Sequence, residues 1–286
     1  MRPSIAHCRP LLVLIMAITL PATWAQAVII ANDNFSYSAG DLHGQNGGTG
    51  WSDAWDADAS STETVVSTGL SYGITGGGTV GGDGSGALQI GAGGFGELAF
   101  RLLPSQSGNA VFFRALVKLS AGTFETSGSP DALLFWFDNA IAGGTHSTNI
   151  PNIGLLSDSN NDYAVRLNSS TVARLGGHVD NDMHLIVGKL YKTAPGPTGY
   201  YNRFSMWLDP LAGDEAAPDA TATTTSNYLQ NFQYLGIRSN SLDTGDAFII
   251  DEILLADSFS DVVPLPEPAT LAMMLLGGLA TIRRRR

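Results

Sequence analysis

Between residues 28 and 265, runs of alternating hydrophobic and polar residues are separated by clusters of Gly, Ser, Asn and Asp. In residues 110–119, Val111, Phe113 and Ala115 alternate with more variable positions that include Arg114. A period of two is typical of half-buried antiparallel strands. We therefore expect strands at the following ranges: 87–90, 96–102, 110–119, 132–137, 152–156, 163–167, 183–192, 203–208, 234–239 and 248–255.

Many strands at this spacing favour an all-β sandwich. Residues 76–86 are expected to form a glycine-rich loop, and residues 209–226 a long acidic excursion. Because neither a linker nor a 20–50-residue repeat divides the strands, we expect one domain at residues 28–264.

The charge of this domain excludes one class of partner. The whole chain has a formal net charge of −11, and residues 28–265 hold nine basic and 25 acidic residues, a net charge of −16. Phosphate backbones repel such a surface, so nucleic acid is not expected as a partner.

Residues 1–27 have the pattern of a secretory signal peptide. Arg2 and Arg9 flank the single cysteine, Cys8, and the apolar run at residues 11–20 ends at Pro21. Small residues at 25 and 27 suit signal peptidase, and ten apolar residues are too few to span a bilayer. We expect the export machinery to deliver a body without cysteine.

The C-terminus has three ordered parts: Pro266-Glu267-Pro268, an apolar run at residues 269–282, and the arginines at 283–286. As a helix, 14 residues span about 21 Å, less than the ~30 Å hydrocarbon core. The arginines resist translocation, so this short apolar helix suits a transient membrane stop. An uncleaved tail helix with snorkelling arginines is the alternative.

Residues 265–286 resemble the PEP-CTERM sorting signal, and the matching positions are Pro266, Glu267, Pro268, Arg283, Arg284, Arg285 and Arg286. This resemblance implies export in a Gram-negative bacterium and processing by an exosortase-type membrane transpeptidase. It also implies delivery to the cell surface or to an exopolysaccharide (biofilm) matrix.

A second resemblance covers most of residues 31–264. The segments at 33–55, 184–210 and 235–264 are similar to concanavalin A-like, laminin-G-like jelly rolls. This family implies two packed antiparallel sheets, and some of its members bind sugars or structural calcium. It supplies no catalytic residue for this chain.

Candidate carbohydrate contacts are aromatic residues with polar neighbours, because sugar rings stack on flat aromatic faces. They are Trp51, Trp55, Tyr191, Arg203 and Trp207. An alternative for Trp51 and Trp55 is that they plug the end of the sandwich, since large aromatic side chains are usually buried.

Asp33 and Asp251 are candidate ligands of a structural calcium ion. We expect Asp251 to share a strand face with Ile249 and Ile253. A carboxylate buried on that face requires a cation or several hydrogen-bond donors. Similar sandwiches bind calcium between their first and last strands, which would join Asp251 to Asp33 or Asn32. No other cofactor is expected.

Motifs for catalysis lack their structural context. Residues 69–73 match G-x-S-x-G at Ser71, but glycines follow where a hydrolase needs a helix. Asp251 and Glu252 are adjacent strand residues, and we expect them on opposite faces. The sequence therefore predicts a non-catalytic surface or matrix protein in contact with exopolysaccharide; a polysaccharide hydrolase or lyase on the same fold, or a purely structural component, is the alternative.

Overall fold

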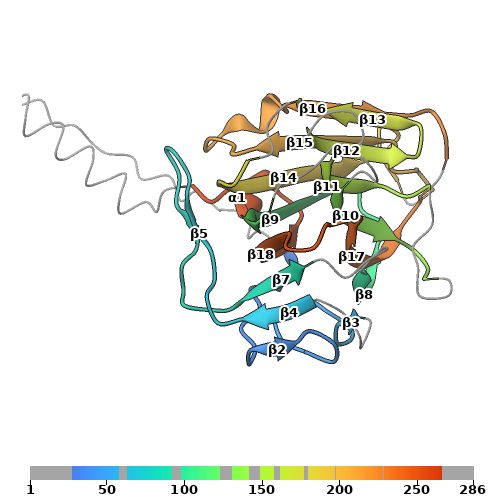
Figure 1. Ribbon diagram of the computed structural model, residues 1–286. Coiled ribbons are helices and arrows are strands. Elements are labelled where there is room, and N and C mark those ends of the chain that lie inside the picture. Colours follow the sequence, from blue (N-terminus) through green and yellow to red (C-terminus); the bar gives the residue numbers. More distant parts are fainter. Residues whose placement is uncertain are drawn as a thin grey trace, which may run out of the picture.

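A computed structural model describes residues 28–57, 63–91, 98–122, 131–141, 149–157, 162–176, 180–196, 198–227 and 229–265. These residues form an all-β structure in which two antiparallel sheets lie face to face (Figure 1). The fold class expected from the alternating pattern is confirmed as an antiparallel all-β sandwich.

One sheet has nine strands. Its order is β16 (Ala220–Thr223), β15 (Arg203–Leu208), β14 (Met183–Tyr191), β9 (Ala110–Ala121), β18 (Ala247–Ala256), β7 (Ala87–Gly91), β4 (Glu63–Val66) and β2 (Gly40–Asp41), and β1 (Ile29–Asp33) also pairs with β18. The first strand and the last strand of the body, β1 and β18, are therefore hydrogen-bonded neighbours.

The second sheet has seven strands. Its order is β13 (Thr171–Arg174), β12 (Asp162–Asn168), β11 (Asn152–Leu156), β10 (Ala132–Asp138), β17 (Phe232–Asn240), β8 (Leu98–Gln106) and β3 (Asp56–Ala57). A separate hairpin joins β5 (Ser71–Gly73) to β6 (Thr79–Gly81). The two short helices are η1 (Asp214–Ala216) and α1 (Phe259–Val262).

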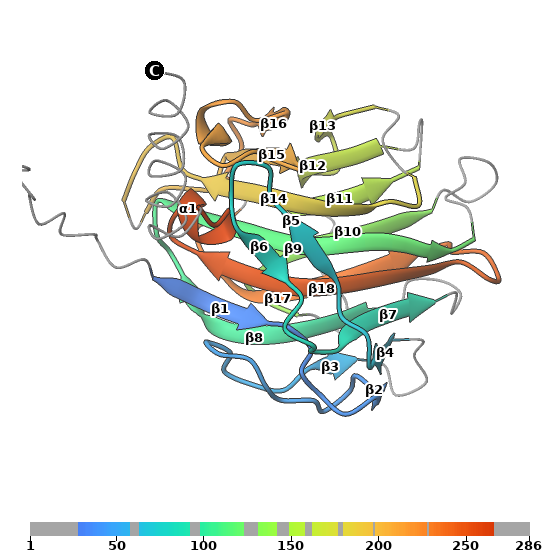
Figure 2. The same cartoon turned by 90° about the vertical axis from the view of Figure 1, so that its left-hand side faces the viewer.

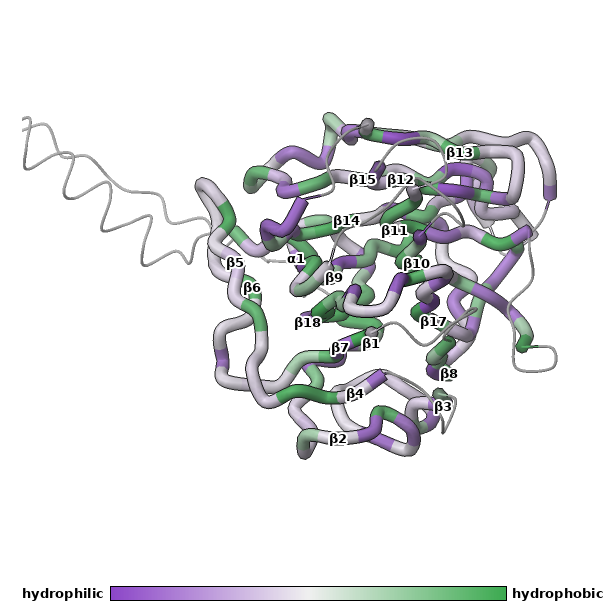
Figure 3. The backbone as a smooth tube through the Cα atoms, viewed as in Figure 1, coloured by the Kyte–Doolittle hydropathy of each residue, from purple (hydrophilic) through white to green (hydrophobic). Residues whose placement is uncertain are grey.

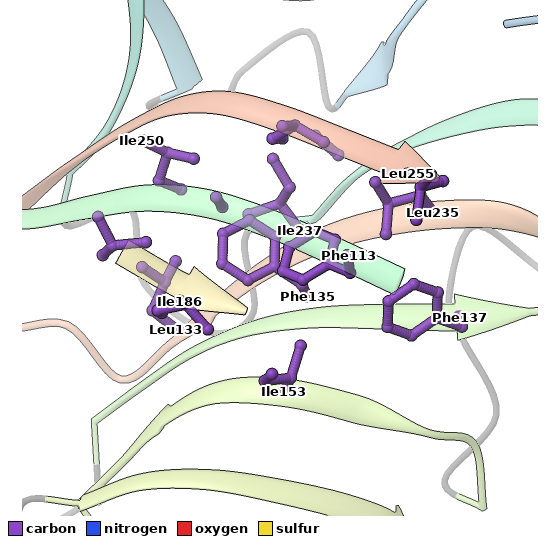
Figure 4. Packing of buried hydrophobic residues seen from close by; sticks show 14 of the residues in the cluster. Phe113, Leu133, Phe135, Phe137, Ile153, Ile186, Leu235, Ile237, Ile250 and Leu255 are labelled. Carbon is purple, nitrogen blue, oxygen red and sulfur yellow. The ribbon is translucent and has the colours of Figure 1, made fainter. Parts of the chain in front are cut away.

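A continuous hydrophobic core separates the sheets (Figure 4). Phe113 of β9 and Phe135 of β10 come from opposite sheets, and their ring centroids are 5.0 Å apart. Phe137 packs edge-on against Phe113 at 5.7 Å. Burying each such ring contributes about 1.5–3 kcal/mol, which gives a body without cysteine its main stabilising term.

All ten strands expected from the sequence are present, with ends that differ by a few residues. Short strands in mixed or glycine-rich sequence were not foreseen: β1 to β6, β13 and β16. Two of them, β6 and β16, lie inside the segments that we expected to be loops. Burial and pairing with long neighbours define these strands, because their own alternation is too brief to predict them.

The outer face of the nine-stranded sheet is covered by its own chain. Figure 2 shows the β5–β6 hairpin crossing in front of β14, β9 and β18, with α1 beside it. Ile74 and Val80 of the hairpin region and Phe259 of α1 join a second apolar cluster on this face. Figure 3 shows stretches of apolar colouring on β14, β9 and β18, beside the hairpin. On the outer face of the seven-stranded sheet, the apolar cluster formed by the described residues comes from that sheet's own strands.

A β-bulge in β18 changes which residues face the core. Ile250 and Ile253 both belong to the core between the sheets, so the alternation skips one position at Asp251 and Glu252. Glu252 has a φ of 54°, in the left-handed region. Because a bulge places an extra residue in one strand, both carboxylates lie on the outer side. Our expectation that they lie on opposite faces is therefore wrong.

The predicted signal peptide at residues 1–27 and the sorting signal from Pro266 onward lie outside the described residues. Within the described part of the chain, the helices are too short and too polar to span a membrane.

Candidate functional site

A groove runs across the outer face of the seven-stranded sheet. Its pocket has a volume of about 270 Å³ and is lined by Asp131, Ala132, Leu134, Leu156, Arg166, Arg238 and Asn240. These residues come from β17, β10, β11 and β12, with Asp131 just before β10. All four strands are adjacent, so the site lies on paired backbone rather than on loops.

The register of the strands explains the shape of this pocket. Ala132 pairs with Asn240 on one side and with Leu156 on the other, and Leu134 pairs with Arg238. Gly154 lies opposite Leu134, with a φ of 152°. Apolar side chains on the two central strands form the floor, and longer polar side chains on the two flanking strands form the walls.

Gly154 is required at its position. A Cβ atom there would lie 2.1 Å from the backbone oxygen of Leu133, so another residue would push the strands apart. Ala164, in the next strand, lies opposite Gly154 and is buried. Gly154 therefore allows β11 to pair closely with β10 beside the pocket.

An aromatic cluster lies beside the groove on the same face. Trp136 packs flat against Gly236, where a Cβ would approach the indole ring to 2.0 Å. Phe100 lies 6.4 Å from Trp136 and 6.1 Å from Tyr234 between ring centroids. Trp136 is buried, whereas Phe100 and Tyr234 are half-buried and present apolar surface. Tyr234 precedes Arg238 by four strand residues, about 13 Å along β17.

Three arginines occupy this face. Arg166 and Arg238 line the pocket, and Arg174 lies at the edge, with its Nη1 3.7 Å from Oδ2 of Asp162. Both pocket arginines also have an interaction partner within the chain, which holds their side chains in place. The pocket therefore offers guanidinium donors, one carboxylate and one amide above an apolar floor.

Trp55, one of the predicted sugar contacts, is 1% exposed and has no free ring face. Its Nε1 donates to Oδ2 of Asp33 at 2.8 Å. Trp51 is partly buried and donates to the backbone oxygen of Asn32 at 2.8 Å. Arg101 stacks on Trp51 with its guanidinium carbon 5.0 Å from the ring centroid. The alternative function of these two residues, closing the end of the sandwich, fits this geometry.

Trp207 is also buried, at 2% exposure. Its Nε1 donates to the backbone oxygen of Asp214 at 2.9 Å, and its ring contacts Phe259 of α1 at 5.1 Å. Tyr191 and Arg203 are directly paired across β14 and β15. Arg203 is exposed and Tyr191 is half-buried, so these two of the five predicted carbohydrate contacts form an accessible pair.

Asp33 is held by an ion pair rather than left open for a cation. Its Oδ2 lies 2.6 Å from Nη1 of Arg101, and both side chains are 1% exposed or less. It also accepts hydrogen bonds from the hydroxyl of Tyr37 at 2.5 Å and from the backbone N–H of Phe35 at 2.9 Å. Burial raises the pKa of Asp33, and these donors oppose that rise.

The two predicted calcium ligands point to opposite faces of the sheet. Asp33 pairs with Ile253, which faces the core, whereas Asp251 pairs with Leu116, which faces outward. Asp251 accepts hydrogen bonds from the N–H groups of Leu70 at 2.8 Å and Glu252 at 2.7 Å. Burial raises the pKa of Asp251 to about 7. Among the described residues, no cluster of three His, Cys, Asp or Glu side chains is arranged to bind a metal ion.

The motif residues considered for catalysis have structural partners. Ser71 lies in β5 of the hairpin, opposite Gly81. Glu252 forms an ion pair with Arg114, with a distance of 3.0 Å between Oε2 and Nη2. Neither residue reaches the groove, which lies on the other sheet.

His184 is fixed between two carboxylates. Its Nδ1 lies 2.6 Å from Asp209, and its Nε2 lies 2.9 Å from Asp180. Burial lowers the pKa of His184, but the hydrogen bonds to Asp209 and Asp180 outweigh it and raise the pKa to about 9. The imidazole is therefore cationic at neutral pH and has a structural role, since it joins Asp180 and Asp209.

The pocket residues were missed in the sequence. Arg166 and Arg238 are each the one basic residue of a strand whose centre is mostly apolar, and this single positive charge is the signal that could have singled them out. Only the pairing of β17 with β10, β10 with β11 and β11 with β12 brings them to one pocket.

No protein family model and no curated protein sequence matches the chain. Among solved structures, it is similar to the metal-free carbohydrate recognition domain of Emp46p, with 13% identity and a TM-score of 0.42 over 59% of this chain and 81% of that one. A carbohydrate esterase from Shiga toxin-encoding bacteriophage phi24B is 15% identical, with a TM-score of 0.46 over 80% and 98% of the two chains. The exoplasmic/lumenal domain of VIP36, in its Ca²⁺/Man3GlcNAc-bound form, is 9% identical, with a TM-score of 0.43 over 72% and 86%. Because these sequence identities and TM-scores are low, the function of this chain has to be inferred from its own residues.

Proposed function

We propose that this protein is an exported, non-catalytic surface or matrix protein that binds extracellular polysaccharide in the groove on its seven-stranded sheet. The observation that carries the proposal is the pocket of about 270 Å³ that polar side chains from four adjacent strands form over an apolar floor. Small-molecule sites combine apolar walls with a few placed polar groups in this way.

The chemistry of the lining suits a sugar. The Asn240 amide, the Asp131 carboxylate and the two guanidinium groups supply both donors and acceptors for hydroxyl groups. Leu134 and Leu156 supply apolar surface for the C–H face of a ring. The half-buried rings of Phe100 and Tyr234 extend this apolar surface along the face.

A binding role accounts for the lining better than glycoside hydrolysis does. Most glycosidases use two carboxyl groups on either side of the scissile bond. Among the described residues that line the pocket, Asp131 is the one with a carboxylate. The described lining therefore supplies binding groups, and one carboxylate alone does not make the acid and base pair of a glycosidase.

We also propose that the C-terminal signal places this body at the cell surface. The motif at residues 266–268, the apolar run and the final arginines support processing by an exosortase-type transpeptidase. The chain enters this signal directly after α1 and Leu265, on the covered side of the nine-stranded sheet. The groove lies on the opposite sheet, away from that attachment point.

A glycan array probed with the protein and with Ala132→Leu tests the binding site. Ala132 is 7% exposed at the floor, and a leucine there fills the pocket. We expect the wild-type protein to bind a subset of glycans and Ala132→Leu to lose that binding with its melting temperature within a few degrees. Ala121→Leu, at an exposed end of β9, is the matched control and should bind normally. Binding that survives Ala132→Leu would contradict the proposed site.

A further inference from the structure

We infer that the groove selects glycans carrying anionic groups, either carboxylates or sulfates, and that Arg166 and Arg238 are the residues that recognise them. This inference rests on the proposed function and names the ligand class of the same site.

The first observation is the placement of the two arginines. Arg238 lies on β17 and Arg166 on β12, with β10 and β11 between them. Three strand spacings of about 4.8 Å separate their backbones by roughly 14 Å. Both residues nevertheless line one pocket. The pocket thus has an arginine on each of its two outer strands.

The second observation is the scarcity of positive charge elsewhere. Residues 28–265 contain nine basic residues against 25 acidic ones. Three of the nine, Arg166, Arg174 and Arg238, stand on the outer face of this one sheet. Arg174 lies against Asp162, and the described lining of the pocket contains two arginines and one carboxylate, that of Asp131. Because the protein as a whole is acidic and repels anionic polymers, these two arginines are the described groups of the pocket that can hold an anionic group.

The third observation is the residue type. Each basic residue of the pocket is an arginine, whose planar fork binds carboxylates and sulfates through two parallel N–H donors. The interaction partners that both arginines have within the chain reduce the rotational freedom lost on binding. A neutral sugar does not need paired guanidinium N–H donors, since amide groups and single N–H or O–H groups satisfy its hydroxyl groups.

The two anion sources are distinguished by three arrays of oligosaccharides: polyuronates, sulfated glycans and neutral glycans of matched length. We expect the full-length protein to bind anionic probes at least tenfold more tightly than neutral ones. This preference should weaken as salt is raised from 50 to 500 mM. The anionic array that is bound identifies the group.

Two substitutions test the arginines independently. Arg238→Gln and Arg166→Gln each remove one guanidinium group, and each should weaken binding of the anionic probe about tenfold, or ~1.4 kcal/mol. Lys118→Gln removes one positive charge from the exposed surface of β9 and should leave binding unchanged. Melting temperatures of all variants identify any loss that comes from unfolding, and two arginine variants allow one of them to fail.

The possible failures have different meanings. Equal binding of neutral and anionic glycans, unaffected by either arginine variant, would overturn the anionic class and leave polysaccharide binding standing. Equal weakening by Lys118→Gln would assign the effect to overall charge and would also overturn the inference. Binding to none of the three arrays would overturn the proposed function itself.

Discussion

Loss of Arg101 should destabilise the protein more than loss of any surface arginine, because it leaves a buried carboxylate without its cation. Arg101 and Asp33 are each 1% exposed, and the guanidinium also donates to Asn46 at 2.8 Å and to the backbone oxygen of Asp53 at 2.8 Å. In Arg101→Met the aliphatic stem is kept, but Asp33 retains only the neutral donors of Phe35, Tyr37 and Trp55.

Removing one partner of a buried ion pair costs about 3–5 kcal/mol. For a domain of 150–250 residues, each kcal/mol shifts the melting temperature by about 2–4 °C, so we expect a decrease of about 6–20 °C. Adding Asp33→Asn should recover part of this loss, since it removes the unpaired charge. Differential scanning calorimetry and urea unfolding at pH 7 measure both changes.

The deficit of Arg101→Met should also shrink toward acidic pH. Burial already raises the pKa of Asp33, and removing the cation raises it further. Protonation then neutralises the buried carboxyl group in the folded state, so the penalty is present above this pKa and fades below it. A melting temperature within 2 °C of the wild type, or a deficit that is independent of pH, would refute the assigned role of the pair.

Four further results are expected. Burial raises the pKa of Asp251 in the folded state to about 7, so the wild-type protein loses stability as the pH rises from 4 to 7. The melting temperature of Asp251→Asn should therefore rise relative to that of the wild type over this pH range. A difference between the two melting temperatures that does not change with pH would contradict this. The pKa of His184 is raised to about 9, so the protonated imidazole contributes fully to folding stability below about pH 6.5, and this stability is lost as the pH approaches 9. In His184→Gln, the melting temperature should no longer decline over this pH range. Gly236→Ala should displace the Trp136 indole and cost about 1–3 kcal/mol in urea unfolding, with a changed near-ultraviolet circular dichroism spectrum. Mass spectrometry of protein released from cells should find the C-terminal tail removed, whereas an intact Arg286 terminus would contradict processing.

The long strands could be predicted from the sequence because each alternates over enough residues to show which face is buried. Phe113 and Ala115 fall in the core as their positions in the pattern indicate. The short strands could not be predicted, since two to four residues carry no reliable period. The bulge at Asp251 and Glu252 was equally hidden, because it depends on the pairing of β18 with both β1 and β7.

The aromatic candidates show why chemistry alone is insufficient to find a site. Trp55 and Trp207 have the composition of sugar contacts, yet each is buried and donates its indole N–H to a neighbour. Arg166 and Arg238 lack any local motif and are 72 residues apart in the chain. Sheet topology brings them together, and the sequence pattern does not specify which strands are neighbours.

A structure of the protein with an oligosaccharide chosen from the arrays tests the central claim most directly. We expect the sugar to lie over Ala132 and Leu134, with an anionic group within hydrogen-bonding distance of Arg166 or Arg238. A sugar bound instead at the exposed corner of Tyr191 and Arg203, or on the covered face of the nine-stranded sheet, would contradict it.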